Sequence, residues 1–223
     1  MARARHAREN DSLLAGVEKR ALLWMAARLP RWITADHLTV LGLVAMAGVG
    51  AAFWASRWSD LALIGVVVGL ALSWFGDSLD GTVARIRKHE RPRYGFYVDH
   101  VVDIASMLLL CAGMALSPHM SPVVALVLLA AYLMVSAEAY LATHACGVFR
   151  LSLMKIGPTE LRILLAAGAV RLLVGGPDVE LLGASWRLFD MGGAIGAAGL
   201  FGALAFSALR NGLALYRAEP LPR

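Results

Sequence analysis

Six apolar runs, separated by short polar or turn-forming segments, make up most of the sequence after residue 37. They are Leu38–Ser56, Leu61–Gly76, Gly95–Ser117, Val123–Thr143, Thr159–Val174 and Leu188–Leu209. A helix needs about 20 mostly apolar residues to cross the hydrocarbon core of a bilayer. No period-two alternation is sustained, and open sheet edges cannot face lipid, so we expect no strand. The pattern predicts an all-α integral membrane protein with six transmembrane helices.

The first 33 residues differ from the rest of the chain. Residues 1–11 are polar and basic, and residues 12–33 mix charged side chains with apolar ones at helical spacing. Such a helix is too charged to span and lies instead in the plane of the membrane interface, a depth that suits Trp24 and Trp32. We therefore expect a basic tail and amphipathic interfacial helix over 1–33, followed by a six-helix transmembrane domain over 34–223.

Composition and charge agree with a membrane location. The 223 residues are 59% hydrophobic and 17% charged, whereas soluble domains are roughly 45–50% apolar and about 25% charged. With six spans, nearly all of the 21 Lys and Arg residues fall on the side that holds both termini, and only Arg57, Arg171 and Arg187 fall on the other. By the positive-inside rule we expect a plasma (inner) membrane protein with cytoplasmic termini. The basic charge is thereby explained, and no nucleic-acid partner is expected.

Four aspartates lie in or beside the second and third runs, where charge is costly. Asp77 and Asp80 are spaced i, i+3, and Asp99 and Asp103 are spaced i, i+4, so each pair shares one helix face. The short segment 86–94 makes the two helices antiparallel neighbours, which brings both pairs to one depth near the cytoplasmic surface. An ionised carboxylate costs ~3 kcal/mol or more in a membrane and marks a functional site. Divalent cations neutralise such a cluster well, so we predict a two-metal site; a proton or ion pathway is the alternative.

The stretch from Asp77 to Asp103 reads D-S-L-D-G-T-V-A-R, nine residues, then G-F-Y-V-D-H-V-V-D. It resembles the signature of the class-I CDP-alcohol phosphotransferase (phosphatidyltransferase) family, D-x2-D-G-x2-A-R-x8–9-G-x3-D-x3-D, at all eight fixed positions. The resemblance extends to Ile33–Gly42, which is similar to the family's T-P-N-x-(I/L)-T-x-x-G lead-in. Ala35 and Asp36 stand here in place of the usual Pro-Asn. Six spans and an interfacial helix also match the family.

The resemblance implies a phospholipid-synthesis enzyme that transfers a phosphatidyl group from CDP-diacylglycerol to a small polar alcohol and releases CMP. Two Mg²⁺ or Mn²⁺ ions would be held by four carboxylates, those of Asp77, Asp80, Asp99 and Asp103. Asp103 would also be the general base that takes the proton of the acceptor hydroxyl. The nucleotide pocket would consist of Asp80, Gly81, Ala84, Arg85 and Gly95. Residues 34–223 would then be the catalytic domain, and its site would face the cytoplasm.

Several polar residues have two interpretations. Arg85 either contacts a phosphate or anchors the helix at the surface, and His100 either makes structural hydrogen bonds or assists the base. Glu138 has either a structural polar partner or a role in acceptor recognition. The basic region 150–162 either lines the acceptor site or is an interfacial loop; its candidates are Arg150, Lys155, Glu160 and Arg162. Gly65-x3-Gly69 and Gly192-x3-Gly196 favour close helix packing, either within the bundle or in a homodimer.

Two other functions compete with phosphatidyl transfer. A CDP-linked head group of the ethanolamine or choline type could pass to diacylglycerol, which the D-H-x-x-D at 99–103 and the T-E at 159–160 favour. The small size of the chain favours phosphatidyl transfer instead. A divalent-cation or proton transporter would place polar groups near mid-membrane in both halves, whereas these acids cluster at one edge. The sequence does not identify the acceptor alcohol.

Overall fold

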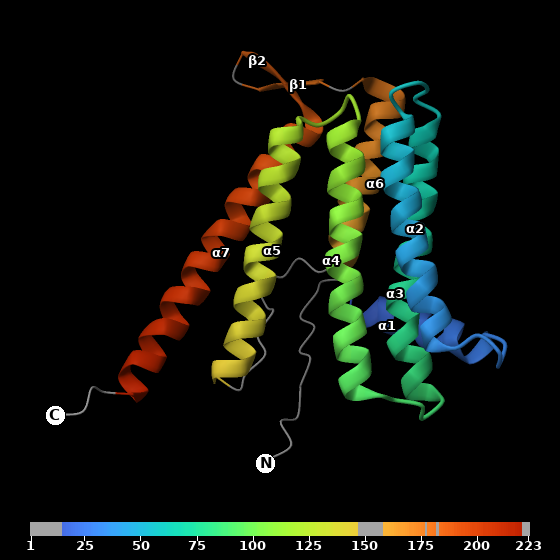
Figure 1. The fold of residues 1–223 in the computed structure, drawn as a ribbon. Coiled ribbons are helices and arrows are strands. Elements are labelled where there is room, and N and C mark those ends of the chain that lie inside the picture. The colour runs from blue at the N-terminus through green and yellow to red at the C-terminus, as the bar shows by residue number, and fades with distance from the viewer. Residues whose placement is uncertain (1–14, 147–157, 177, 182, 220–223) are drawn as a thin grey trace.

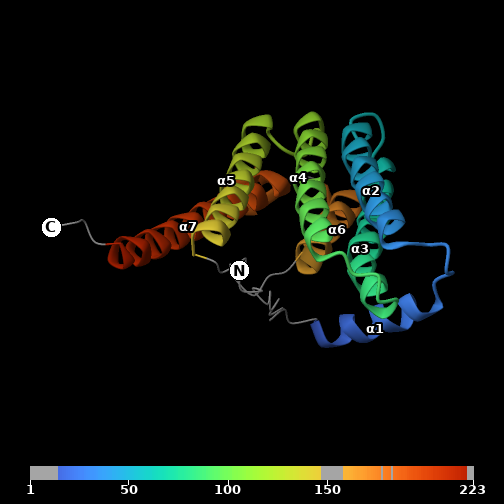
Figure 2. The same ribbon diagram turned by 60° about the horizontal axis from the view of Figure 1, so that its bottom comes forward.

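A computed structural model describes residues 15–146, 158–176, 178–181 and 183–219. Its elements are α1 (Ala15–Arg28), α2 (Ala35–Ala55), α3 (Ala62–Ile86), α4 (Pro92–Leu116), α5 (Pro122–Cys146), α6 (Pro158–Gly175), β1 (Asp178–Leu181), β2 (Ala184–Arg187) and α7 (Leu188–Ala218). Helices α2 to α7 stand alongside one another and alternate in direction (Figure 1). Helix α1 lies across one end of this bundle and the β-hairpin covers the other, here named the α1 end and the hairpin end (Figures 1 and 2). The predicted helical membrane architecture is confirmed.

The described residues contain fewer helices of spanning length and hydropathy than the six expected. Among the described residues, five helices are long and apolar enough to cross a membrane, namely α2, α3, α4, α5 and α7. Helix α6 stands where the fifth span is expected, but its 18 residues include Glu160, Arg162 and Arg171. It is not among the five, so the six-span count stays a prediction. Helix α3 continues beyond the expected Gly76 to Ile86, which places Asp77 and Asp80 inside the helix.

The expectation that the chain contains no strand is wrong. Strands β1 and β2 pair antiparallel in the connection between α6 and α7, with Val179 opposite Trp186. The argument against strands holds inside apolar runs, where lipid cannot satisfy an open edge, but not in a connection outside them. Gly183, at φ 78°, supplies the left-handed conformation that the turn between the strands requires.

Helix α1 packs on the end of α3 that carries the aspartates. It ends at Arg28, earlier than the expected residue 33, because Pro30 lacks an N–H donor and disfavours helix in the residue before it. Ala26 is buried in a small apolar cluster with residues of α2 and α3, namely Leu38, Leu79 and Val83. Trp24 and Trp32 remain exposed, at 59% and 72%. Helix α1 therefore covers the base of the bundle with its apolar face.

Small residues set the distances between helices in the rest of the bundle. A β-carbon at Gly69 of α3 would stand 2.7 Å from a methyl group of Val49 in α2, and one at Gly113 of α4 would stand 2.2 Å from the Gly50 carbonyl oxygen. In lipid, helices associate through van der Waals packing, and small residues permit close backbone approach. Gly65 and Gly69 thus pack within the chain, which is the first of the two interpretations of that stripe.

The main apolar core occupies the hairpin half of the bundle. Phe53, Leu63 and Val66 are fully buried there, and the ring of Phe53 meets that of Phe189 edge-on at 5.5 Å between centroids. Helices α2 to α7 all contribute to this cluster. The half toward α1 holds the four aspartates, so the main apolar core and these acids lie in opposite halves of the bundle.

Candidate functional site

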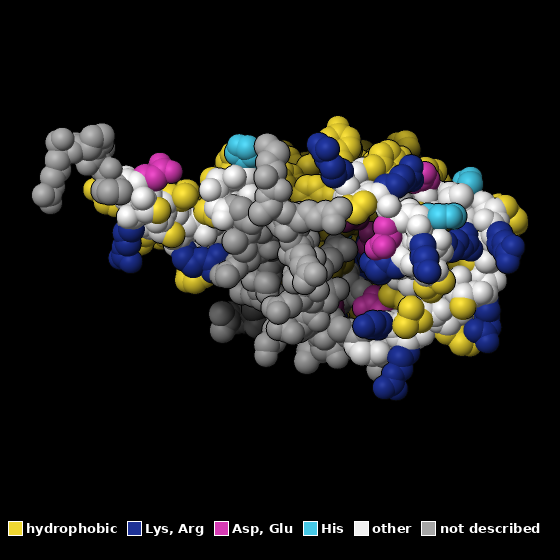
Figure 3. Space-filling model, turned by 90° about the horizontal axis from the view of Figure 1, so that it is seen from below, with side chains coloured by type: hydrophobic (Ala, Val, Ile, Leu, Met, Phe, Trp, Pro, Cys, Tyr) yellow, Lys and Arg dark blue, Asp and Glu magenta, His cyan; other side chains and the backbone are white. Residues whose placement is uncertain are grey.

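A pocket lies between four helices in the α1 half of the bundle. Its lining side chains come from α2, α3, α4 and α6 and are Thr39, Gly42, Ser73, Asp77, Asp80, Asp99, Val102, Asp103, Ser106 and Arg162. All four predicted metal-binding aspartates are among them. Seen from the α1 end, acidic side chains lie among Lys and Arg side chains (Figure 3). The pocket therefore combines carboxylates with positive charge at one end of a membrane bundle.

Three of the aspartates approach one another closely enough to share a metal ion. One carboxylate oxygen each from Asp77, Asp99 and Asp103 lies within 4.8 Å of the others. Asp77 comes from α3, whereas Asp99 and Asp103 lie one turn apart on α4. Carboxylate oxygens in this number match the ligands that Mg²⁺ and Mn²⁺ prefer. The donor set thus fits a hard divalent cation.

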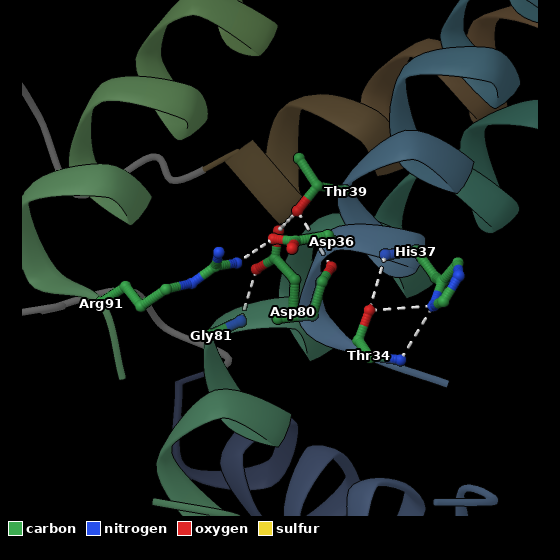
Figure 4. Close-up of polar contacts among 8 residues, drawn as sticks. Thr34, Asp36, His37, Thr39, Asp80, Gly81 and Arg91 are labelled. Carbon is green, nitrogen blue, oxygen red and sulfur yellow. Dashed lines mark hydrogen bonds and ion pairs between the residues drawn. The ribbon is translucent and has the colours of Figure 1, made fainter. Parts of the chain in front are cut away.

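Asp80 lines the same pocket but is not one of these three. Its carboxylate accepts a hydrogen bond from the Thr39 hydroxyl, at 2.7 Å, and another from the backbone N–H of Gly81 (Figure 4). Thr39 was not among the candidate site residues. Its signal in the sequence is the T-x-x-G end of the lead-in. Gly42, at that end, lies close to α3: a β-carbon on it would stand 3.5 Å, an ordinary contact distance, from the backbone nitrogen of Asp77.

The lead-in also fixes where α2 and α4 begin. Thr34 caps α2 in a capping box with His37, whose ring nitrogen Nδ1 accepts from the Thr34 backbone N–H at 3.1 Å (Figure 4). Asp36 forms an ion pair with Arg91, the residue before α4. The hydrogen bond from Arg91 to that carboxylate raises the pKa of the guanidinium above its ordinary value. The start of α4, and with it Asp99, is thereby tied to the start of α2.

Arg162 is the acceptor-site candidate that the structure brings into the pocket. Its Nη2 donates to Oδ2 of Asp77 at 2.8 Å, with the two side chains 18% and 31% exposed. Its Nη1 is buried and has no hydrogen-bond partner among the described residues. Because buried donors are normally satisfied, this nitrogen marks a place where an anionic oxygen of a ligand can bind.

The model of one protein family, that of the CDP-alcohol phosphatidyltransferases, matches residues 32–204. This chain belongs to that family. No curated protein matches the chain. Transferases of this family act on CDP-linked lipid and alcohol substrates in membranes and use divalent metals, which agrees with the aspartate cluster. The matched segment begins at the lead-in and includes Thr39, the aspartates and Arg162.

Of the nucleotide-site candidates, Asp80 lines the pocket, whereas Gly81, Ala84, Arg85 and Gly95 are not in its lining. Gly81, Ala84 and Arg85 occupy the last turns of α3, and the guanidinium of Arg85 lies over Gly81, 3.3 Å from where a β-carbon would stand. Arg85 also donates to the Thr82 hydroxyl at 3.1 Å. Gly95 is exposed and lies one turn before Asp99. These residues lie in the last turns of α3 and the first turn of α4, toward the α1 end of the bundle.

Among the described residues, the candidates His100, Glu138 and Glu160 are not in the pocket lining. Nδ1 of His100 lies 2.7 Å from the Phe96 carbonyl oxygen, and its ring meets that of Tyr140 on α5 at 5.3 Å. Glu160 is in the first turn of α6, with its Oε1 buried. Arg150 and Lys155 lie outside the described residues.

Glu138 has polar partners on the last helix. Its Oε1 accepts hydrogen bonds from the Ser207 hydroxyl at 3.0 Å and from the Asn211 amide at 2.9 Å. A buried charged group needs such partners, and both come from α7. Glu138 therefore joins α5 to α7, which matches its structural interpretation.

Proposed function

We propose that this chain transfers a phosphatidyl group from CDP-diacylglycerol to a small polar alcohol and releases CMP. We also propose that it does so in the plasma membrane, with its site on the cytoplasmic side. The observation that carries the proposal is the convergence of Asp77, Asp99, Asp103 and Arg162 in one pocket at the α1 end. A water-soluble nucleotide reaches that end directly. The exposed apolar faces of the helices accommodate the acyl chains.

The residues of the pocket have different roles in the proposed reaction. Bound Mg²⁺ or Mn²⁺, held by the aspartates, supplies charge neutralisation for the diphosphate and the departing CMP. Asp103 accepts the proton of the acceptor hydroxyl while that oxygen forms a bond to the phosphorus of the phosphatidyl group. The bond between this phosphorus and the CMP oxygen breaks, and CMP departs with both electrons of that bond. Arg162 binds a phosphate oxygen through Nη1.

Head-group transfer to diacylglycerol is the alternative donor assignment, and it uses the same pocket. The sequence features that favour it centre on His100 and Glu160, neither of which lines the pocket. His100 is oriented toward Tyr140 instead. This arrangement supports phosphatidyl transfer as the first choice, and supplying the two kinds of donor separately tests that assignment.

The test is release of CMP by the purified protein in lipid nanodiscs. CDP-diacylglycerol is supplied with single acceptors (serine, glycerol phosphate, inositol phosphate and choline) and with Mg²⁺ or Mn²⁺. A second arm supplies CDP-ethanolamine or CDP-choline with diacylglycerol. No CMP in either arm would refute the enzyme proposal, and CMP in the second arm alone would refute the choice of donor.

The role of Asp103 is tested by Asp103→Asn. We expect turnover to be lost while Mn²⁺ and nucleotide binding remain measurable, because the amide keeps the shape but cannot take the proton. Asp178→Asn is the matched control, since Asp178 is exposed on the hairpin at the far end. Normal turnover in Asp103→Asn would show that another group is the base.

A further inference from the structure

One carboxylate oxygen of α1 connects three helices. Oε1 of Glu18 accepts a hydrogen bond from the indole N–H of Trp74 in α3 and another from the hydroxyl of Thr159 in α6, each at 2.8 Å. The other described contacts of α1 with the bundle are mainly apolar, through Ala26 and its neighbours. Glu18 is thus a polar link between the helix across the base and the two helices that carry Asp77 and Arg162.

Each donor lies one helical turn from a member of the ion pair between Asp77 and Arg162. Trp74 precedes Asp77 by three residues in α3, and Thr159 precedes Arg162 by three residues in α6. Residues at this spacing lie on the same face of a helix, about 4.5 Å apart along its axis. Helices α3 and α6 run in opposite directions (Figure 1), so Trp74 lies a turn from Asp77 toward the hairpin end and Thr159 lies a turn from Arg162 toward the α1 end. The two helices are thus joined twice, through Glu18 and by the ion pair of Arg162 with Asp77.

Apolar packing does not fix the first two turns of α6, before Leu165. Its buried residues are Ala169 and Leu172, both in the second half, and its partly buried residues in the main core begin at Leu165. The described residues before Leu165 contribute to neither apolar cluster. The position of Arg162 is therefore set by polar contacts, of which the one through Thr159 and Glu18 does not involve the pocket itself.

We propose that Glu18 is a positioning residue of the transferase: it holds the first turn of α6 against α3 and so directs Arg162 to Asp77. The inference rests on the proposed function for its catalytic meaning but not for its geometry. Because α1 lies across the base of the bundle (Figure 2), the same link makes the position of the Arg162 charge near the aspartates depend on how α1 packs. A residue with a purely structural role would stabilise the fold without changing the position of Arg162.

The test is a double-mutant cycle read by Mn²⁺ affinity, with free Mn²⁺ measured by electron paramagnetic resonance in protein without substrate. Arg162→Ala removes a positive charge from the aspartates, so we expect Mn²⁺ to bind up to about fivefold more tightly, as for a partly exposed ion pair. Glu18→Ala should produce the same direction of change by releasing Arg162. In the double variant the two effects should not add, because Glu18 then has nothing left to position.

Two matched variants separate hydrogen bonding from charge. Glu18→Gln keeps the acceptor oxygen without the charge and should bind Mn²⁺ as the wild type does. Glu90→Ala replaces an exposed loop residue and removes the same charge as Glu18→Ala, without removing a described contact between helices. Thr159→Val removes only the bond to α6, so it should reproduce Glu18→Ala and tests the link even if that variant does not fold.

The inference would be overturned by additive effects in the double variant, by Glu18→Gln matching Glu18→Ala, or by unchanged Mn²⁺ affinity in Thr159→Val. CMP release provides a second readout, in which Glu18→Ala should raise KM more than it lowers kcat. Because Mn²⁺ binding needs no substrate, a wild type that released no CMP would refute the proposed function and leave the positioning role measurable.

Discussion

Gly76, one residue before Asp77, leaves no room for a side chain between α3 and α2. A β-carbon there would stand 2.5 Å from the Leu38 carbonyl oxygen and 2.7 Å from the backbone nitrogen of Gly42, whereas ordinary contact begins at 3.4 Å. Both neighbours belong to the backbone of α2, so no side-chain rotation relieves the overlap. Gly76→Ala must therefore move α2 away from α3 by about 1 Å, which we expect to cost about 1–3 kcal/mol of stability.

The same movement reaches the site. The hydrogen bond from Thr39 to Asp80 joins α2 to α3 at 2.7 Å, and a displacement of about 1 Å would stretch it beyond hydrogen-bonding distance. A misplacement of that size in an active site can lower the rate by about 10²-fold. We therefore expect Gly76→Ala to lower both the unfolding temperature and kcat/KM for CMP release.

Gly48→Ala is the control for this substitution. Gly48 is on α2, and no atom lies within 4 Å of where its β-carbon would stand. Both variants gain the same helix propensity, about 1 kcal/mol in favour of alanine, so their difference isolates the overlap at Gly76. Thermal unfolding in detergent and CMP release are measured on both. If Gly76→Ala unfolded and reacted as Gly48→Ala does, the close approach of α2 to α3 would not be what holds Thr39 at Asp80.

Three further predictions concern single polar contacts. Thr39→Val removes the hydrogen bond to Asp80 with little change of shape. Because a hydrogen bond to a charged group contributes about 1.5–3 kcal/mol, kcat/KM should fall by roughly 10- to 100-fold. The Arg87 guanidinium donates hydrogen bonds to carbonyl oxygens of the turn 29–33, two of which are 3.0 and 3.1 Å long, and Arg87→Ala removes them. It should loosen α1, lower the unfolding temperature and increase proteolytic cleavage near residue 28. Burial holds the pKa of His119 below its ordinary value of 6.5, so wild-type stability should fall as pH is lowered through 6.5, and fall less in His119→Gln.

Each of these has a control. The hydroxyl of Thr143 bonds only within its own helix among the described contacts, at 2.6 Å, so Thr143→Val should keep full activity. Arg93 is exposed, and Arg93→Ala should leave α1 in place. For His119, both ring nitrogens are buried without a described hydrogen-bond partner, and Arg187 opposes its protonation while Asp60 favours it. The unfolded chain therefore binds the proton more readily, and equal pH profiles for wild type and His119→Gln would contradict this reasoning.

The sequence predicted most of the fold because each of its signals is local. Charge-free runs such as Leu38–Ser56 mark helices in lipid, and the i, i+3 and i, i+4 spacings place the aspartates on one face of each helix. The hairpin at 178–187 was missed since its strands are short, exposed and outside the apolar runs. The helix over 12–33 was predicted too long because its apolar spacing continued past Pro30, which ends the helix.

What the sequence by itself determined is the membrane class of the chain, its family, and the acids that enter the site. The tertiary structure alone decided which groups meet: that Asp80 is held by Thr39, that Asp77 is paired with Arg162, and that Glu18 links α1 to both helices. The physical reason is that helical periodicity fixes the direction of a side chain within its own helix only. The rotation and separation of neighbouring helices depend on close contacts such as that of Gly76 with α2, which involve residues far apart in the chain.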